Sequence, residues 1–158
     1  RYFPKDDFIH LIRHPIESCC RRTHMTSRRK KPIGAACMDA SYKHIGRPLE
    51  YMETDSEVMH NAAGWVMQTD MAVAALNHLA GSGTSLLVRH EDVVGDPQAA
   101  FDRIKAFVGS RAQTEGQPLD IDPERVNSGA RDHPEAGLGW EICGATASQF
   151  GYEFSPVN

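Results

Sequence analysis

Apolar residues in the first strand candidate follow each other almost without interruption. Residues 7–13 hold four large apolar side chains within the stretch FIHLI. Such a run is typical of a strand that is covered on both faces of a parallel sheet. A second, shorter run over 85–88 predicts another strand of the same kind. The two runs therefore predict a parallel sheet that is buried between other elements.

Apolar residues at helical spacing predict the helices that separate and follow these strands. The strongest pattern spans 56–80, where Thr54 and Glu57 form a capping-box pair at the start. Asp96 and Pro97 mark the N-cap and first residue of a helix that Gly109 ends. Weaker helices are expected over 15–29 and 141–150, and irregular chain over 31–54 and 110–139. This alternation predicts an α/β fold with three layers, a parallel sheet flanked by helices, in one domain over 1–158.

Both predicted strands end in the same dipeptide. Arg13 and His14 follow the first strand, and Arg89 and His90 follow the second. In parallel sheets, ligands bind at the carboxyl ends of the strands. If the two strands are neighbours, four basic side chains meet at one rim, where the arginine forks suit a phosphate. The sequence therefore predicts a site for a phosphate-bearing nucleotide, with ordinary ion pairs to nearby carboxylates as the alternative.

A glycine-rich stretch over 81–85, GSGTS, resembles a phosphate-binding loop but occurs in the wrong place. A phosphate-binding loop follows a strand and opens a helix, so that its N–H groups point at the phosphate. Here a predicted helix comes before the stretch and a predicted strand comes after it, and the stretch lacks the lysine of such loops. We therefore interpret GSGTS as a turn, which weakens the alternative that the chain is a P-loop-type small-molecule kinase.

Composition and charge indicate an ordinary globular protein. Hydrophobic residues make up 41% and charged residues 24% of the chain, and no apolar run is long enough to span a membrane. The net charge of -4 argues against general nucleic-acid affinity, and no specific nucleic-acid partner is expected, although basic residues crowd 21–31. Four cysteines without a regular disulfide spacing predict reduced thiols and a cytoplasmic location. The histidines and cysteines near the N-terminus match no zinc spacing, so no metal site is expected.

Three stretches resemble, in the same order, the family of sulfotransferases that use 3′-phosphoadenylyl sulfate (PAPS), and most of all its bacterial members. FIHLIRHPIES over 8–18 is similar to the 3′-phosphate-binding segment of that family. LLVRHEDVVGDPQAAFDRIKAFVG over 86–109 resembles its Tyr-Glu-Asp-Leu, Asp-Pro and helix signature, and ICGATASQFGY over 142–152 resembles its C-terminal helix. The resemblance implies part of the P-loop-like sulfotransferase fold. It also implies transfer of a sulfuryl group from PAPS to a hydroxyl or amine of a small-molecule or carrier-bound acceptor.

The same resemblance implies roles for individual residues. Arg13 corresponds to the arginine that grips the 3′-phosphate, and His90 stands where the family often has a tyrosine near the nucleotide. The family's phosphate-binding serine corresponds to Ser18 or, at the family's usual spacing, to the position that Arg21 occupies, and both alternatives stay open. The 5′-phosphosulfate loop and the catalytic base are expected upstream of residue 1. The chain is therefore expected to be the C-terminal part of a sulfotransferase.

Two other functions stay open. A truncated or degenerate domain that binds a nucleotide without catalysing transfer would also fit an expected missing loop and an arginine at position 21. A nucleic-acid-binding fragment would use the basic residues of 21–31, and steeply salt-dependent, sequence-independent binding would identify it. The acceptor and the oligomeric state leave no signal in the sequence.

Overall fold

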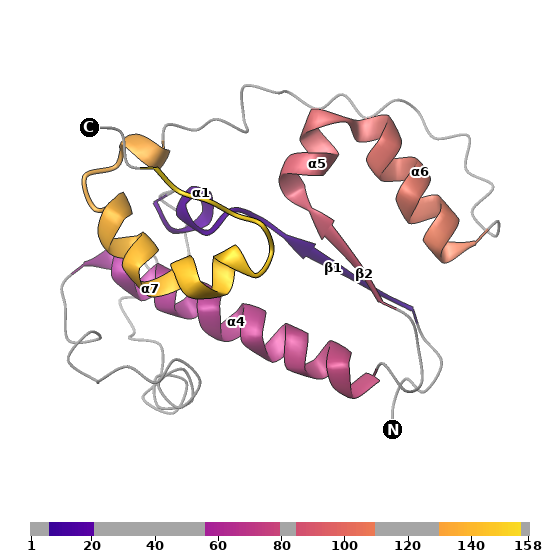
Figure 1. The fold of residues 1–158 in the computed structure, drawn as a ribbon, viewed down its shortest axis with the longest axis horizontal. Coiled ribbons are helices and arrows are strands. Elements are labelled where there is room, and N and C mark those ends of the chain that lie inside the picture. The colour runs from indigo at the N-terminus through magenta and orange to yellow at the C-terminus, as the bar shows by residue number, and fades with distance from the viewer. Residues whose placement is uncertain (1–6, 21–55, 80–84, 110–129, 156–158) are drawn as a thin grey trace. The chain divides into compact units, whose positions relative to one another are not determined.

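The computed structural model describes residues 7–20, 56–79, 85–109 and 130–155 (Figure 1). The chain divides into two compact units, and one of the boundaries between them falls between Arg13 and His14. The first unit includes the described residues 7–13, 72–79 and 85–109. The second unit includes the described residues 14–20, 56–71 and 130–155. We describe each unit by itself.

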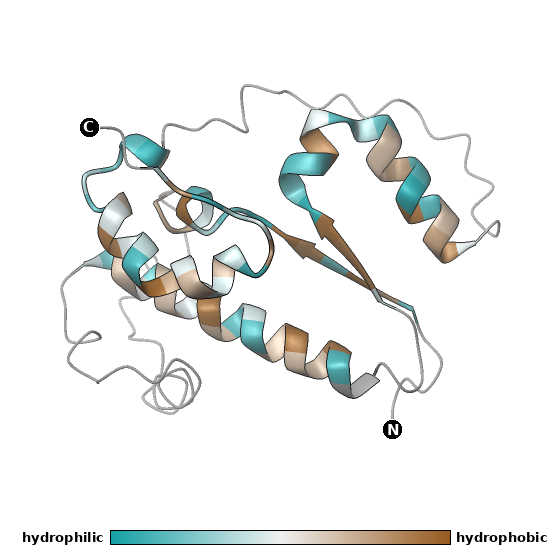
Figure 2. Ribbon diagram, viewed as in Figure 1, coloured by the Kyte–Doolittle hydropathy of each residue, from teal (hydrophilic) through white to brown (hydrophobic). Residues whose placement is uncertain are grey.

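The first unit is built on a two-stranded parallel sheet of β1 (Phe8–Ile12) and β2 (Ser85–Arg89). The register pairs Phe8 with Ser85 at one end and Ile12 with Arg89 at the other. Both strands are hydrophobic over most of their length (Figure 2). Two strands at the predicted places and their parallel pairing are thus confirmed, and with them the α/β character of the fold.

The two faces of β1 differ in burial. Ile12 is buried, whereas the side chains of Ile9 and Leu11 are 44% and 59% exposed. Successive side chains of a strand point to opposite faces, so β1 is packed on one face and open on the other. The prediction that both faces of this strand are covered is therefore wrong for β1 in the described structure.

Two helices follow β2 without a long connection. The first, α5 (His90–Gly95), was not predicted, because six residues directly after a strand give too short a pattern for helical periodicity. The second, α6 (Pro97–Val108), has the predicted cap: Ala99 N–H donates to Asp96 Oδ1 at 2.9 Å. Gly109 ends it with a φ of 79°, a conformation that glycine adopts without strain.

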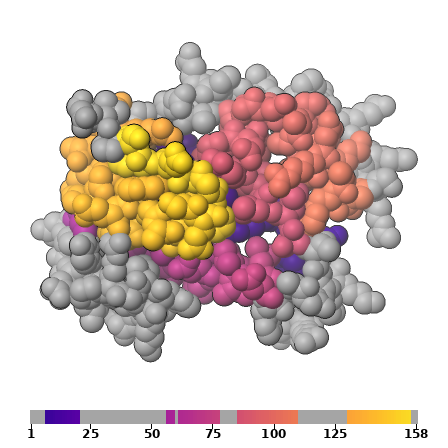
Figure 3. All heavy atoms as spheres, in the orientation of Figure 1, coloured from indigo at the N-terminus to yellow at the C-terminus, as the bar shows by residue number. Residues whose placement is uncertain are grey.

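The second unit is helical, with α1 (Pro15–Cys19), the first part of α4 (Glu57–Leu79), the 3₁₀ turn η3 (Ala130–Asp132) and α7 (Ala136–Ser148). In Figure 3 the atoms of α7 and of the chain after it (orange to yellow) form one continuous block that borders the atoms of α4. The core combines small and medium side chains from α1, α4 and α7: Ile16, Cys19, Val58, Met59, Ala62, Ala63, Val66, Ala136, Ile142 and Cys143.

Helix α4 was predicted correctly, and a serine hydroxyl accepts a backbone hydrogen bond at its start. Thr54 lies outside the described residues, and Ser56 Oγ accepts a hydrogen bond from Met59 N–H at 3.2 Å. The helix predicted over 15–29 is described only as far as Cys19, and residues 21–29 lie outside the described chain.

Helix α7 corrects the loop predicted over 110–139 within its described part. It begins at Ala136, ahead of the predicted residue 141. The misleading residues are Gly137 and Gly139, which look like loop glycines. At Gly139, however, an added Cβ would lie 2.9 Å from Val58 Cγ1 and 3.4 Å from Ile16 Cδ1. Glycine at this position therefore serves close packing against α1 and α4, which a local pattern does not reveal.

The structure bears on two earlier conclusions from the sequence, that GSGTS is a turn and that no apolar run spans a membrane. Ser85 begins β2, so a strand does follow the GSGTS stretch, whose other residues lie outside the described chain. Among the described helices, none combines the length and the apolar character that a membrane crossing requires.

Candidate anion-binding site

Three basic residues meet at the carboxyl end of the two-stranded sheet. Because Ile12 pairs with Arg89, Arg13 and His90 are the next residues of the two neighbouring strands. All three residues belong to the first unit. The parallel register therefore brings Arg13, Arg89 and His90 to the same edge of the sheet, as the matching dipeptides predict.

At least one nitrogen atom of each of these side chains is shielded from water. Nε and Nη2 of Arg13, Nε of Arg89 and Nδ1 of His90 are all buried. A charged donor that has lost its hydration gains most from an ionised partner, since charge-assisted hydrogen bonds are about twice as strong as neutral ones. Two guanidinium groups held in this way at one sheet edge favour an anion with several oxygen atoms, such as a phosphate.

The acidic pair next to this edge has a structural explanation. Glu91 and Asp92 occupy the first turn of α5, whose N-cap residue Arg89 makes no side-chain capping bond. Carboxylates in a first turn stabilise a helix by opposing the positive end of its dipole. The position of the two carboxylates thus gives them a structural role at the start of α5.

His14 does not join the other three basic residues. Only 3% of it is exposed, and it is the N-cap of α1 in the second unit. Ile16 N–H donates to its Nδ1 at 3.2 Å, and its Nε2–H donates to the Glu153 carbonyl oxygen at 3.0 Å. The expectation that four basic side chains converge on one rim is therefore wrong for His14, because Pro15 turns the chain into a helix that this ring caps.

Of the two candidates for the phosphate-binding serine position, one lies within the described residues and the other lies outside them. Ser18 lies on α1, where its hydroxyl donates to the His14 carbonyl oxygen at 3.2 Å. A hydroxyl that donates one hydrogen bond still has lone pairs with which to accept others. Arg21 lies outside the described residues. The alternative between Ser18 and Arg21 therefore stays a prediction.

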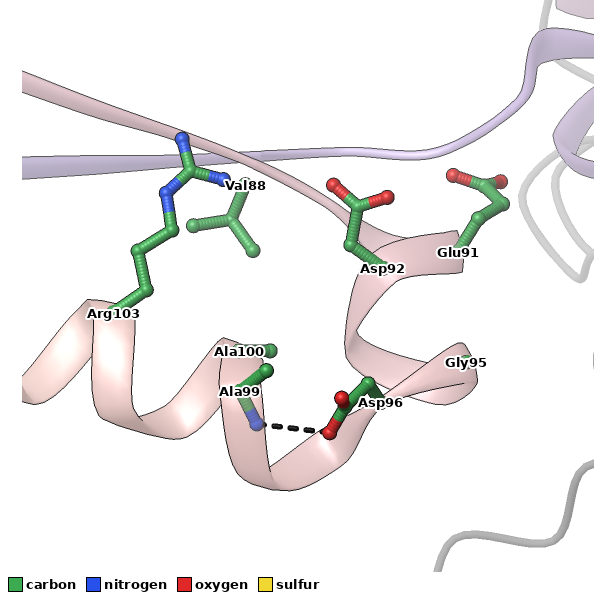
Figure 4. A pocket seen from close by; sticks show the side chains of 8 residues that line it. All are labelled: Val88, Glu91, Asp92, Gly95, Asp96, Ala99, Ala100 and Arg103. Carbon is green, nitrogen blue, oxygen red and sulfur yellow. Dashed lines mark hydrogen bonds between the residues drawn. The ribbon is translucent and has the colours of Figure 1, made fainter.

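A pocket of about 390 Å³ lies beside the sheet edge, between β2, α5 and α6 (Figure 4). Its charged lining consists of Glu91, Asp92, Asp96 and Arg103, and its apolar lining includes Val88. Arg103 also donates to the Leu87 carbonyl oxygen at 3.1 Å. Three carboxylates against one guanidinium repel a phosphate, so this pocket is separate in chemistry from the cationic sheet edge.

The two neighbouring cysteines at the end of α1, Cys19 and Cys20, are poor nucleophiles. Burial, followed by the neighbouring Cys143 and Cys20 thiols, raises the pKa of Cys19 far above its usual value. Burial, helped by the charges of Glu17 and Glu135, raises the pKa of Cys20 to about 11. These thiols stay protonated near neutral pH and are unsuited to nucleophilic catalysis. Within the described chain, no group of three or more potential ligands is placed to hold a metal ion.

Comparison with known proteins gives one match. The family model described as "Sulfotransferase family" matches residues 1–114, which include both strands and both Arg-His dipeptides. No curated protein and no solved structure matches the chain.

Proposed function

The chain belongs to the sulfotransferase family, and on that premise we propose that it takes part in transfer of a sulfuryl group from PAPS to an acceptor hydroxyl or amine. The observation that carries the proposal is the cationic sheet edge. Arg13, Arg89 and His90 end two paired parallel strands inside the region that the family model matches. The nitrogens shielded there suit the phosphate groups of a nucleotide.

In this proposal the sheet edge holds the 3′-phosphate of the donor. Arg13 contacts it through its planar fork, Arg89 adds a second positive charge, and His90 donates a further hydrogen bond. The family resemblance assigns a further phosphate contact to Ser18 or, at the family's usual spacing, to Arg21. When bound, PAPS supplies the sulfuryl group: its sulfur–oxygen bond to the nucleotide breaks, the acceptor's bond to sulfur forms, and the acceptor's proton goes to a base.

Calorimetric titration tests the nucleotide site directly. The 158-residue chain should bind adenosine 3′,5′-bisphosphate more tightly than adenosine 5′-monophosphate. Arg13→Ala should remove that preference, with a loss of about tenfold to a hundredfold in affinity for the bisphosphate. Arg131→Ala is the matched control, because Arg131 is an exposed arginine of η3 in the second unit. Equal affinity for the two nucleotides would contradict the 3′-phosphate site.

Transfer itself needs a separate assay. Incubation with sulfur-labelled PAPS and a panel of hydroxyl and amine acceptors should give labelled product and adenosine 3′,5′-bisphosphate in equal amounts. Bisphosphate binding without transfer to any acceptor class would favour the second candidate, a domain that binds the nucleotide but does not catalyse the reaction.

A further inference from the structure

The ring of His14 is held by both of its nitrogen atoms and by aromatic contacts. Ile16 N–H donates to Nδ1 at 3.2 Å, and Nε2–H donates to the Glu153 carbonyl oxygen at 3.0 Å. The ring stacks on Trp140 with a centroid distance of 5.8 Å and meets Tyr152 edge-on at 5.2 Å. One side chain thus joins the start of α1 to α7 and to the C-terminal segment, residues 151–155.

These contacts select one protonation state. A nitrogen that accepts a hydrogen bond carries no proton, so the proton lies on Nε2 and the ring is neutral. A second proton on Nδ1 would point at Ile16 N–H, and two donors would face each other. Uptake of a proton by His14 therefore breaks the cap of α1.

The charged and titratable groups around the ring carry both signs. Arg13 precedes it in the chain with a charge of the same sign. The elements packed against it carry Glu17 and Cys19 on α1, Glu141 and Cys143 on α7, and Tyr152 and Glu153 in the C-terminal segment. Glu141 and Glu153 are exposed, so water screens their carboxylates, whereas Glu17 is buried. A negative charge on Glu17 would favour a protonated ring, but it would not restore the capping acceptor that Nδ1 provides.

His14 is also the residue bonded to Arg13. The peptide group between them carries the Arg13 carbonyl and the His14 amide, and the capping position sets the His14 backbone at φ -50° and ψ 125°. The His14 carbonyl in turn accepts from Ser18 N–H at 3.1 Å and from the Ser18 hydroxyl at 3.2 Å. Because these hydrogen bonds hold His14 in place, they also restrict the backbone beside Arg13, the residue proposed to contact the 3′-phosphate.

We propose that neutral His14 is a positioning residue for Arg13, and that proton uptake on its ring weakens binding of the nucleotide 3′-phosphate. The inference rests on the proposed function. It predicts an unusual sign, because a histidine that contacts an anion, as His90 does in the proposal, binds it more tightly when protonated. His14 does the opposite, since its proton disrupts the support of the site.

The test compares pH dependence between two variants. Affinity for adenosine 3′,5′-bisphosphate is measured from about pH 8 to about pH 5.5, the range in which histidine changes charge. His90→Asn retains His14 and should lose about tenfold more affinity on acidification than His14→Asn. Asparagine at position 14 keeps the capping acceptor but does not titrate. Protonation of the ligand's phosphates acts equally in both variants and cancels.

A second readout follows the His14 ring without altering it. In a Trp65→Phe background, the emission of Trp140 reports on the stacked imidazole, because a protonated imidazole quenches indole fluorescence. The emission should fall over the same pH range as the affinity of His90→Asn. The Trp140 emission tests the positioning role of His14 even if His14→Asn does not fold.

The outcomes separate the two proposals. Failure of the unaltered chain to bind the bisphosphate at any pH would overturn the proposed function and the positioning role together. Binding with the same pH slope in both variants would overturn the positioning role alone. So would a Trp140 emission that stays constant while the affinity of His90→Asn falls.

Discussion

The same dipeptide ends both strands of the sheet but does different things at the two places. After β2, Arg89 and His90 lie at the sheet edge, and His90 begins α5 as its first residue. After β1, Arg13 stays at the edge, whereas His14 is a buried cap with two hydrogen bonds to backbone groups. The register explains part of the difference, because Ile12 pairs with Arg89 and the two dipeptides are offset by one residue. Pro15 explains the rest, because it starts a helix directly behind His14.

The largest expected effect is the loss of stability in His14→Ala. The variant loses the cap of α1 and leaves Ile16 N–H and the Glu153 carbonyl without their shared partner. The free energy of unfolding should fall by about 2–4 kcal/mol. Urea unfolding followed by tryptophan fluorescence measures it, because Trp65 and Trp140 both lie in the second unit. His90→Ala is the matched control and should cost less than about 1 kcal/mol. Equal losses in the two variants would remove the distinction between the dipeptides.

The next effect concerns ligand affinity at the sheet edge. Arg89→Ala should weaken binding of adenosine 3′,5′-bisphosphate by about tenfold or more, because it removes a shielded guanidinium group. Arg89→Lys keeps the charge but loses the planar fork, so its affinity for the bisphosphate should lie between those of the unaltered chain and Arg89→Ala. Titration calorimetry with both variants measures the difference. Wild-type affinity in Arg89→Ala would restrict the anion site to the end of β1.

A smaller loss of stability is expected from the tight packing around Gly139 of α7. Gly139→Ala brings a methyl group within 2.9 Å of the buried Val58 and should destabilise the second unit by about 1–2 kcal/mol, even after the better helix propensity of alanine. Gly137→Ala on the same helix meets nothing within 4 Å and should be neutral or stabilising. In the first unit, Gly95→Ala also has open space. Thermal unfolding of the three variants tests this contrast. Equal melting temperatures would show that the packing around Gly139 adjusts to a methyl group, which would contradict the prediction.

The smallest effect is electrostatic. The raised pKa of Cys20, about 11, means that its reaction with maleimide should still accelerate as pH rises past 9, whereas an ordinary thiol would level off. Glu135→Gln removes one of the negative charges that raise this pKa, so the rate near pH 8 should increase by a small factor. The amide oxygen can still accept the hydrogen bond that Ser56 Oγ donates to Glu135 at 3.2 Å. Alkylation rates measured by mass spectrometry distinguish Cys20 from the other cysteines.

The elements that the sequence predicted well are those whose signals are local. Strand β1 has a continuous apolar run, α4 has a long helical period, and α6 has Asp96, Pro97 and Gly109 at its ends. The missed helix α5 is only six residues long, and the missed start of α7 contains Gly137 and Gly139, of which tertiary packing explains Gly139. The open face of β1 was likewise invisible, because an apolar run does not reveal which of its side chains are packed.

The sequence by itself determined the alternation of strands and helices, the basic residues at both strand ends and the resemblance to sulfotransferases. These are properties of neighbouring residues, and they survive without knowledge of any distant contact. Tertiary structure alone decided which basic residues share an edge, since the register of β1 with β2 depends on pairing across the sheet. It also decided that His14 is a buried cap, since its partner Glu153 and its stacking partner Trp140 lie at the far end of the chain.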